Sequence, residues 1–319
     1  MKNKISIIVG GSGQFGIELS KSLLKRKHVV IITSRDIKRA KQKLGNNRQS
    51  IIFIKLNILN VKQIEKLLIK YNPDNVFYFA SQSSPGISFK KPRATYLSNF
   101  VGCKNFLEII KFKNLTCKFI NASSCEIFSK SNKRLTIASK KKPISPYGKS
   151  KLLSYNITKS YRNNYNINSY NAVIFNTESI YREKNYLIPK ICISAIRAYK
   201  YQEKTDFGNL KISREWNWCE EQIKFMLKFI NKTPQDFILS NQKNFTAIQM
   251  LRFAFGFFKL NYKNFILINK RNLRPNDFLT KKSNSNSSFK KNKIKHNYKI
   301  YGKKIIYKII KHYLNEKKY

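Results

Sequence analysis

A glycine-rich turn close to the start of the chain constrains its fold more than any other feature. The turn runs G-G-S-G-Q-F-G from Gly10 to Gly16 and follows the apolar run Ile5 to Val9. Between a strand and a helix, the first glycine of G-x-x-G-x-x-G permits a tight turn. The second lets backbone approach a pyrophosphate, and the third lets the helix pack on the strand. Because N–H groups at the start of that helix then face the phosphates, we expect a dinucleotide at Gly10, Gly13 and Gly16.

Short β-branched runs alternate with amphipathic stretches through the first half of the chain. We expect strands at Ile5–Val9, Val29–Thr33, Ile51–Leu56, Asn75–Ala80, Lys118–Ala122 and Asn171–Phe175. We expect helices at Gln14–Arg26, Val61–Tyr71, Ala94–Lys111 and Pro146–Asn163. Continuous apolar runs are typical of strands buried on both faces, and the alternation is typical of βαβ units. The pattern predicts an α/β fold with a Rossmann-type, doubly wound parallel sheet.

The rhythm changes after about Asn176 to irregular segments and separate helices such as Glu220 to Asn231. We expect residues 1–176 to form the Rossmann core and residues 177–319 mainly a smaller C-terminal substrate-binding lobe. Some of its segments would return to the core, and the lobe would cover the strand ends where such sheets bind ligands. The Ser-, Asn- and Lys-rich stretch Lys281 to Lys295 is expected to be a solvated loop. Apolar residues at helical spacing from Ile305 to Leu314 predict a packed amphipathic helix, with membrane-surface binding as the alternative.

The chain is strongly basic, with 64 Lys+Arg against 16 Asp+Glu and a formal net charge of +48. Such a charge raises nucleic acid or an anionic membrane as a partner. The lysines, however, are spread over every segment among Asn, Ile, Phe and Tyr, all residues of A/T-rich codons. We interpret the charge as compositional and expect no specific nucleic-acid partner and no membrane partner. A basic nucleic-acid-binding protein on an inactive Rossmann scaffold remains a competing hypothesis.

The cysteines indicate neither a metal site nor a redox site. The five residues, Cys103, Cys117, Cys125, Cys192 and Cys219, contain no C-x-x-C pair and have no His cluster nearby. Reduced, mostly buried thiols are therefore expected, with no bound metal. The apolar run Ile5 to Val9 is too short for a signal-peptide core or a membrane span. We expect a soluble, cytoplasmic protein.

The end of the second expected strand bears on the choice of dinucleotide. NAD enzymes place an acidic residue there for the ribose 2′-OH, whereas this chain has Thr33-Ser34-Arg35. An arginine can hold a 2′-phosphate, so Arg35 favours NADP. Asp36 follows directly, and a solvent-facing Arg35 is the alternative in so basic a chain.

Tyr147 and Lys151 lie one helical turn apart in the sequence Y-G-K-S-K, directly after Ser145-Pro146. A tyrosine is a poor base at neutral pH, but a neighbouring ammonium and an oxidised nicotinamide would favour its phenolate. It could then remove a hydroxyl proton while hydride leaves the same carbon. The spacing alone could arise by chance in a chain rich in Tyr and Lys, but its place after the fifth expected strand gives it weight.

Together, the glycine motif and Y-x-x-x-K resemble the extended short-chain dehydrogenase/reductase superfamily. Further segments are similar to the GDP-mannose 4,6-dehydratase family within it, in one collinear order over most of the chain. These segments are F-A-S-Q-S from Phe79, A-S-S-C-E-I-F from Ala122, F-N-T-E-S-I-Y-R from Phe175, G-N from Gly208, S-R-E-W from Ser213 and R-P-N-D from Arg274. The chain departs from the family pattern at Phe15, Asn57, Cys125, Thr177 and Pro189, and it lacks the G-D that follows R-P-x-E.

The resemblance implies a catalytic set of Ser124, Glu126, Tyr147 and Lys151. Tyr147, assisted by Lys151 and Ser124, would deprotonate a sugar 4-OH while C4 passes hydride to NADP. Glu126 would then take the C5 proton and assist loss of the 6-OH as water, because elimination needs an acid/base within reach of both positions. Hydride returned to C6 would regenerate the cofactor and leave a 4-keto-6-deoxy sugar nucleotide. A surface carboxylate after a strand is the alternative for Glu126.

The resemblance also assigns binding residues. On the cofactor side it implies Gln14, Phe15, Asn57, Ile58, Phe79, Ala80, Ser81, Gln82, Ser83, Lys151 and Arg182. On the side of a nucleotide sugar such as GDP-mannose it implies Asn176, Glu178, Lys190, Arg214, Arg274 and Asp277, with Asn99 as a supporting polar group. A homo-oligomer, a dimer or tetramer formed through the helices Ala94–Lys111 and Pro146–Asn163, is implied as well. A sugar-nucleotide epimerase or 4-keto reductase of the same superfamily, in which Glu126 is idle, remains the alternative within enzymes.

Overall fold

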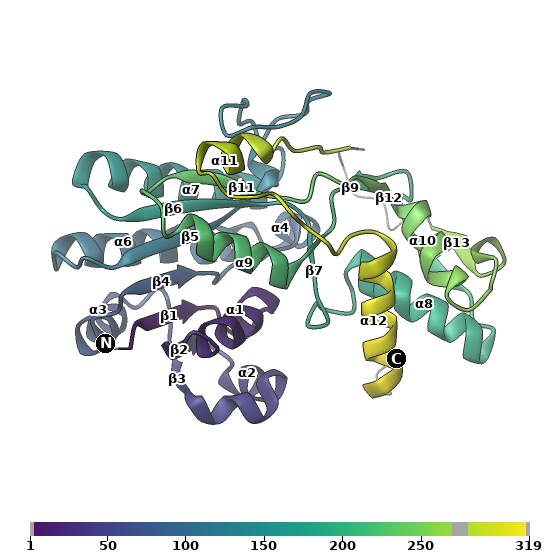
Figure 1. Cartoon of the computed structure of the whole chain (residues 1–319), viewed down its shortest axis with the longest axis horizontal. Coiled ribbons are helices and arrows are strands. Elements are labelled where there is room, and N and C mark those ends of the chain that lie inside the picture. Colours follow the sequence, from purple (N-terminus) through teal and green to yellow (C-terminus); the bar gives the residue numbers. More distant parts are fainter. Residues whose placement is uncertain (1–2, 270–279, 317–319) are drawn as a thin grey trace.

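A seven-stranded parallel sheet organises the chain, and the computed structural model describes residues 3–269 and 280–316 (Figure 1). The sheet has the order β11-β6-β5-β4-β1-β2-β3, and every neighbouring pair is parallel. The strands are β1 Ile5–Val9, β2 Val29–Ser34, β3 Ile51–Lys55, β4 Asn75–Tyr78, β5 Lys118–Ser124, β6 Ser169–Ile174 and β11 Asp236–Leu239. This order is that of a doubly wound Rossmann sheet extended by one strand, which confirms the predicted fold class.

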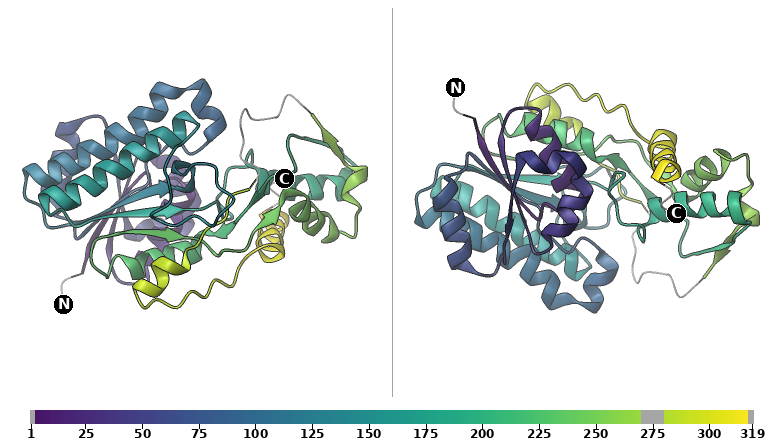
Figure 2. Two further views of the ribbon diagram at one scale, coloured as in Figure 1. Left: turned by 90° about the horizontal axis from the view of Figure 1, so that it is seen from above. Right: turned by 90° about the horizontal axis from the view of Figure 1, so that it is seen from below.

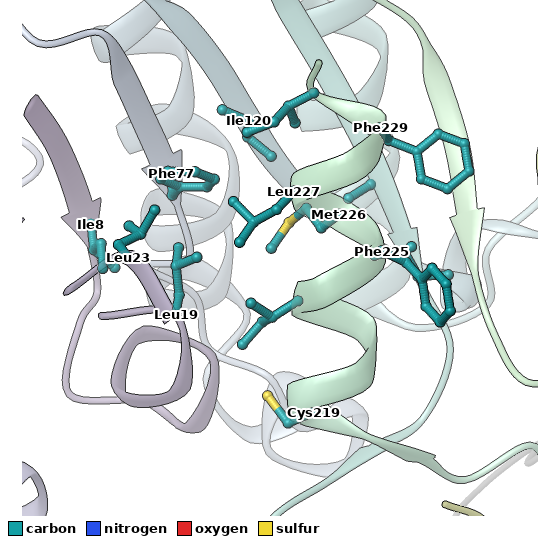
Figure 3. Close-up of a cluster of buried hydrophobic side chains, with 14 of the residues drawn as sticks. Ile8, Leu19, Leu23, Phe77, Ile120, Cys219, Phe225, Met226, Leu227 and Phe229 are labelled. Carbon is teal, nitrogen blue, oxygen red and sulfur yellow. The ribbon is translucent and has the colours of Figure 1, made fainter. Parts of the chain in front are cut away.

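Alternate residues of the strands face opposite layers of helices, which explains their continuous apolar sequences. Ile8, Phe77 and Ile120 pack against α1 Gln14–Leu24 and α9 Cys219–Phe229, as Figure 3 shows. Ile7 and Tyr78 face the other way, toward α3 Val61–Tyr71 and α6 Gly102–Phe112. The helix α7 Pro146–Tyr165 lies beside α6 on that face (Figure 2). Helix α2 Ile37–Leu44 follows β2 and leads into a 3-10 turn over residues 45–50.

The helix expected at Ala94–Lys111 begins earlier and contains an irregular turn. α4 Pro85–Lys90 and α5 Pro92–Tyr96 each begin at a proline, whose fixed φ suits a first helical turn. A π-helical turn, Leu97–Val101, separates α5 from α6. Single π turns inside helices are frequent at functional sites, and this one lies beside the cavity described below.

In the part of the chain that the structure describes, the second lobe consists of three packed helices and short strand pairs at one end of the sheet (Figure 2). The helices are α8 Leu187–Tyr201, α10 Ala247–Gly256 and α12 Lys303–Glu316. The strand pairs are β7 Thr177–Glu178 with β10 Asn217–Trp218, β8 Thr205–Phe207 with β13 Ile266–Ile268, and β9 Ser213–Arg214 with β12 Phe245–Thr246. Buried Ile305, Ile306, Ile309, Ile310 and Tyr313 confirm that the last helix is packed. Within the described residues, no helix is both long and apolar enough to cross a bilayer.

The prediction of a solvated loop at Lys281 to Lys295 is wrong. The segment passes back over the sheet, forms α11 Asn286–Lys291 and then crosses to α12 (Figure 1). Its aromatic residue Phe289 is 1% exposed and packs between Phe225 and Phe229 of α9. Its buried serines find partners, as when Ser285 donates to the Ser240 carbonyl oxygen. Polar composition was misleading because short hydroxyl side chains can be satisfied inside a fold by main-chain groups and by other polar side chains.

Candidate active site

A cavity of about 820 Å³ opens at the carboxyl ends of the parallel strands. It brings together residues that follow β1, β2, β4, β5 and β6, which is where open α/β sheets bind ligands. The expected site residues that line it are Gly10, Gly13, Gln14, Phe15, Gly16, Arg35, Asn57, Ile58, Phe79, Ala80, Ser81, Ser83, Ser124, Glu126, Tyr147, Lys151, Asn176, Glu178, Arg182 and Arg214. Gln82 and Lys190 lie outside this lining. Arg274 and Asp277 fall outside the described residues.

The glycine-rich turn has the geometry that its sequence requires. Gly10 has φ +85°, and a Cβ atom there would lie 2.5 Å from the Ala80 main-chain N. A Cβ on Gly16 would lie 2.4 Å from the Gly11 Cα, so only glycine allows α1 to approach the turn this closely. Gly13 is the N-cap of α1 and has no side chain to occupy the first N–H groups of the helix. Those groups can donate hydrogen bonds to a phosphate, as they do in P-loop and Rossmann helices.

Cations from α2 border the same part of the cavity. Arg35 follows β2, and Arg39, which sequence reasoning missed, lines the cavity one helical turn later. Arg39 and Lys43 both pair with Glu183 in the segment after β7. Burial lowers the pKa of Lys43, and Glu183 partly opposes that effect. These two ion pairs therefore link α2 to the segment that leads into α8.

Tyr147 and Lys151 lie on one face of the first turns of α7. The Ser145 hydroxyl caps this helix by accepting from Gly148 N at 3.0 Å. Lys151 Nζ donates to the Ala122 carbonyl oxygen at 2.8 Å and lies 6.0 Å from the centre of the Tyr147 ring. Burial lowers the pKa of Lys151 to about 8. Burial also raises the pKa of Tyr147, an effect that a hydrogen bond with Ser124 partly offsets.

Ser124 ends β5 and holds the next residues in place. Its Oγ accepts from Glu126 N at 3.2 Å and caps the 3-10 turn Cys125–Ile127. The same side chain bonds to Tyr147, so one hydroxyl positions the phenol and the glutamate together. The Glu126 side chain is 20% exposed and lines the cavity. Its carboxylate is paired with Lys281 Nζ at 2.6 Å.

Asn99 supports the site from the π turn, as a fully buried side chain. Its Oδ1 accepts from Gln82 N at 2.9 Å, and its Nδ2 donates to Ser150 Oγ at 3.0 Å and to the Gln82 carbonyl oxygen at 3.2 Å. The amide therefore joins α7, which carries Tyr147, to the segment after β4. Its supporting role was predicted, but the π turn that aims it was not.

Glu178 is a buried acid at the entrance to the second lobe. It is 3% exposed and lines the cavity, and its Oε2 has no hydrogen-bond partner among the described residues. Burial raises its pKa to about 7, against the opposing charge of Arg182. Asn176 and Arg214 line the cavity nearby. An unsatisfied buried carboxyl is costly, so this end of the cavity is suited to a polar ligand.

Three residues near the site carried no usable sequence signal. Tyr186, which stacks under the Arg182 guanidinium at 3.6 Å, precedes α8 in an irregular segment. Arg39 resembles any other basic residue on a basic helix. Lys281 lies in the segment that polar composition assigned to solvent.

Comparison with known proteins places this architecture in a family. A family model described as GDP-mannose 4,6 dehydratase matches residues 7–301. The chain belongs to the GDP-mannose 4,6-dehydratase family. The resemblance found in the motifs is thereby confirmed.

Two relatives in this family match the chain over more than two thirds of their own length. The chain is 26% identical over 293 residues to GDP-mannose 4,6 dehydratase 1 of Arabidopsis thaliana, covering 86% of this chain and 80% of that protein. It is 30% identical over 254 residues to GDP-mannose 4,6 dehydratase of Cricetulus griseus, covering 74% of this chain and 68% of that one.

Solved structures share the fold across the whole chain. A UDP-N-acetylglucosamine 4-epimerase from Methanobrevibacter ruminantium, in complex with UDP-N-acetylmuramic acid, aligns with a TM-score of 0.86 at 19% identity, covering 99% of this chain and all of that one. A dTDP-glucose 4,6-dehydratase from Bacillus anthracis, in complex with NAD, aligns with a TM-score of 0.84 at 16% identity, covering 99% of this chain and 98% of that one. Both likenesses concern the fold alone.

Proposed function

We propose that this member of the family is a nucleotide-sugar 4,6-dehydratase that converts GDP-mannose, or a similar nucleotide hexose, to its 4-keto-6-deoxy derivative. The observation that carries the proposal is the presence of Ser124, Glu126, Tyr147 and Lys151 on the wall of one cavity, beside the glycine-rich turn. An epimerase needs only the tyrosine and lysine, whereas a dehydratase also needs the acid. Glu126 faces the cavity, which supports the dehydratase over an epimerase or a 4-keto reductase.

Tyr147 acts first, as the base for the sugar 4-OH. Its burial favours the neutral phenol, so the positive charges around it must offset that preference. Lys151 supplies one such charge, because a pKa of about 8 leaves it mostly protonated at neutral pH. A nicotinamide dinucleotide held by the glycine-rich turn would supply the acceptor for the hydride from C4 and the donor of hydride to C6.

Glu126 acts second, once the ketone at C4 has acidified the C5 proton. Its carboxylate takes that proton and passes it to the 6-OH, which leaves as water. One group can serve both positions because the two carbons are adjacent in the sugar. Ser124 fixes the backbone at Glu126, so the carboxylate reaches the ring from a rigid 3-10 turn.

The cofactor in this proposal is NADP. The residues present fit a dinucleotide, because the positive φ of Gly10 and the uncapped start of α1 form a cradle for a pyrophosphate. Arg35 and Arg39 border the cavity after β2, where a 2′-phosphate would lie. Mass spectrometry of the dinucleotide that copurifies with the protein tests this choice against NAD.

The nucleotide sugar would occupy the end of the cavity lined by Asn176, Glu178 and Arg214. Arginine suits a diphosphate because its planar fork donates two parallel hydrogen bonds. Lys190, Arg274 and Asp277 complete the proposed substrate set. We further propose that the protein is cytoplasmic and that it forms a homo-oligomer. Apolar side chains exposed on α5, α6 and α7 support the oligomer, namely Tyr96, Phe112 and Leu153. Sedimentation analysis of the purified chain tests its mass.

The decisive experiment is incubation with GDP-mannose and NADP, with mass spectrometry for loss of one water. The exchange Glu126→Gln should abolish dehydration while the dinucleotide stays bound, and Tyr147→Phe should abolish all conversion. Loss of about a hundredfold or more in rate is expected for each, the usual scale of general acid–base catalysis. Conversion of a 4-keto sugar nucleotide only with added NADPH would favour the reductase instead.

A further inference from the structure

We propose that Lys281 is a positioning residue for Glu126, an ion-pair partner that holds the catalytic carboxylate ionised and aimed at the sugar. The inference deepens the proposed dehydratase function and rests on it for the role of Glu126. It concerns a residue in a segment whose sequence departs from the family pattern, four positions after Asp277.

Lys281 is a buried side chain that contacts the turn carrying Glu126. Its side chain is 3% exposed, although lysine is among the residues least often buried. Its Nζ lies 2.6 Å from Glu126 Oε2 and 3.4 Å from the Cys125 carbonyl oxygen. Both contacts are on the 3-10 turn that carries the candidate acid. A charge this buried is tolerated where it is paired and hydrogen-bonded, as here.

The backbone around Lys281 is fixed by the rest of the fold. Its carbonyl oxygen accepts from Asn244 Nδ2 at 3.0 Å, and the next carbonyl, of Lys282, accepts from Leu135 N at 2.8 Å. Ser283 N donates to Glu215 Oε1 at 2.8 Å. Three other segments of the chain therefore hold the backbone at Lys281. Its side chain reaches Glu126 from a fixed backbone position.

Lys281 is a direct counter-ion of Glu126, and further charged and titratable groups surround the turn that carries this acid. Tyr147 and Cys125 are the neighbours on which the charge of Glu126 acts, and burial raises the pKa of each. Neither side chain can carry a positive charge, so neither can act as a counter-ion for Glu126. Arg214 and Glu215 act on Cys125 from the second lobe. Glu215 is itself satisfied by Ser240, Ser283 and Arg134. Its charge therefore does not replace that of Glu126 as the partner of Lys281.

The pair has a chemical consequence for elimination. An opposite charge within hydrogen-bond distance favours the carboxylate, which is the form that can take the C5 proton. The same contact fixes the position of Glu126 Oε2, and with it the orientation of the carboxylate on the cavity wall. Removing the ammonium would shift Glu126 toward its protonated, inactive form.

The kinetic test compares Lys281→Met with Lys282→Met, since Lys282 is an exposed neighbour in the same segment. We expect Lys281→Met to lower kcat about 10- to 100-fold with KM changed less than about threefold, because the group acts on the acid and not on binding. The acidic limb of its pH–rate profile should move upward. Lys281→Arg should restore part of the rate, and Lys282→Met should behave as the native protein. Equal losses in both methionine variants would overturn the proposal.

A second test does not depend on turnover. Selective ¹³C labelling of glutamate carboxyls, with Glu126→Gln identifying the signal, follows the protonation of Glu126 directly. In Lys281→Met this signal should titrate at a pH about one unit or more above its native midpoint. An unchanged midpoint in a folded variant would sink the ion-pair role. If the native protein makes no 4-keto-6-deoxy product, the proposed function fails, while this titration still decides the pairing.

Discussion

At the scale of single residues, Glu178 makes the free energy of unfolding depend on pH. Burial raises its pKa to about 7 from an ordinary 4.5, so the folded protein prefers the neutral acid. The stability contributed by that preference is fully present below about pH 4.5 and is lost as the pH rises through 7. Above pH 7 the loss amounts to roughly 3 kcal/mol, at 1.36 kcal/mol for each pH unit between the two values.

The exchange Glu178→Gln should therefore stabilise the protein at pH 8 and have little effect at pH 5. We expect a gain of about 2 to 3 kcal/mol in the free energy of unfolding at the higher pH. Urea unfolding at the two pH values measures it. Glu183→Gln, at a half-exposed carboxylate, serves as the control and should change stability by less than about 1 kcal/mol. A gain that is the same at both pH values would contradict the assignment.

The candidate site was predictable at residues whose chemistry is tied to spacing. Tyr147 and Lys151 share a helix face because they are four apart, and Glu126 follows a strand end, where ligands bind. Lys281 could not be predicted, because its partner lies 155 positions away and its neighbours are polar. Only the folded path of residues 280–285 brings the two charges together.

At the scale of elements, the contact between α1 and the glycine turn depends on a missing side chain. Gly16→Ala would place a Cβ 2.4 Å from the Gly11 Cα, against backbone that cannot rotate away. We expect a loss of about 1 to 3 kcal/mol of stability, the usual cost of overpacking, together with weaker dinucleotide retention. Thermal unfolding and the copurified dinucleotide content measure the two effects.

A matched glycine exchange separates overpacking from helix propensity. Gly256 ends α10, and a Cβ there would meet no atom within 4 Å among the described residues. Gly256→Ala should be neutral or stabilising by up to about 1 kcal/mol, because it restricts the unfolded chain. If both variants lose stability alike, the close approach of α1 is not the cause of the effect at Gly16.

Elements with strong periodicity were predicted well, and those that depend on distant partners were not. All six expected strands and α3 lie within two residues of their expected bounds, since the strands are continuous apolar runs and α3 shows a clear apolar stripe. The short strand β11 was missed, because four residues after a helix give little local signal. It becomes a strand only by pairing with β6.

At the scale of the whole molecule, the formal net charge of +48 determines how the surface binds polyanions. This binding is distinct from the chemistry of the site. Several of the 16 acidic residues are engaged in ion pairs, as Glu65 is with Lys113 and Asp236 with Arg162. Much of the remaining positive charge lies on exposed lysines spread over both lobes. A dispersed charge attracts any polyanion without selecting a sequence.

Binding to RNA or heparin should therefore be non-specific and should collapse as salt is added. For six or more neutralised phosphates, affinity should fall about a thousandfold or more between 50 and 200 mM salt. Retention of the dinucleotide should persist over the same range, because in the proposed binding mode main-chain N–H groups at the start of α1 bind its pyrophosphate in addition to any surface lysines. Filter binding at a series of salt concentrations, with the copurified dinucleotide measured in the same samples, compares RNA binding with dinucleotide retention.

The nucleic-acid hypothesis would prevail if RNA stayed bound at high salt with a preferred sequence while no dinucleotide was retained. Loss of both ligands in parallel would instead mean that the glycine turn binds anions only through the general field of the protein.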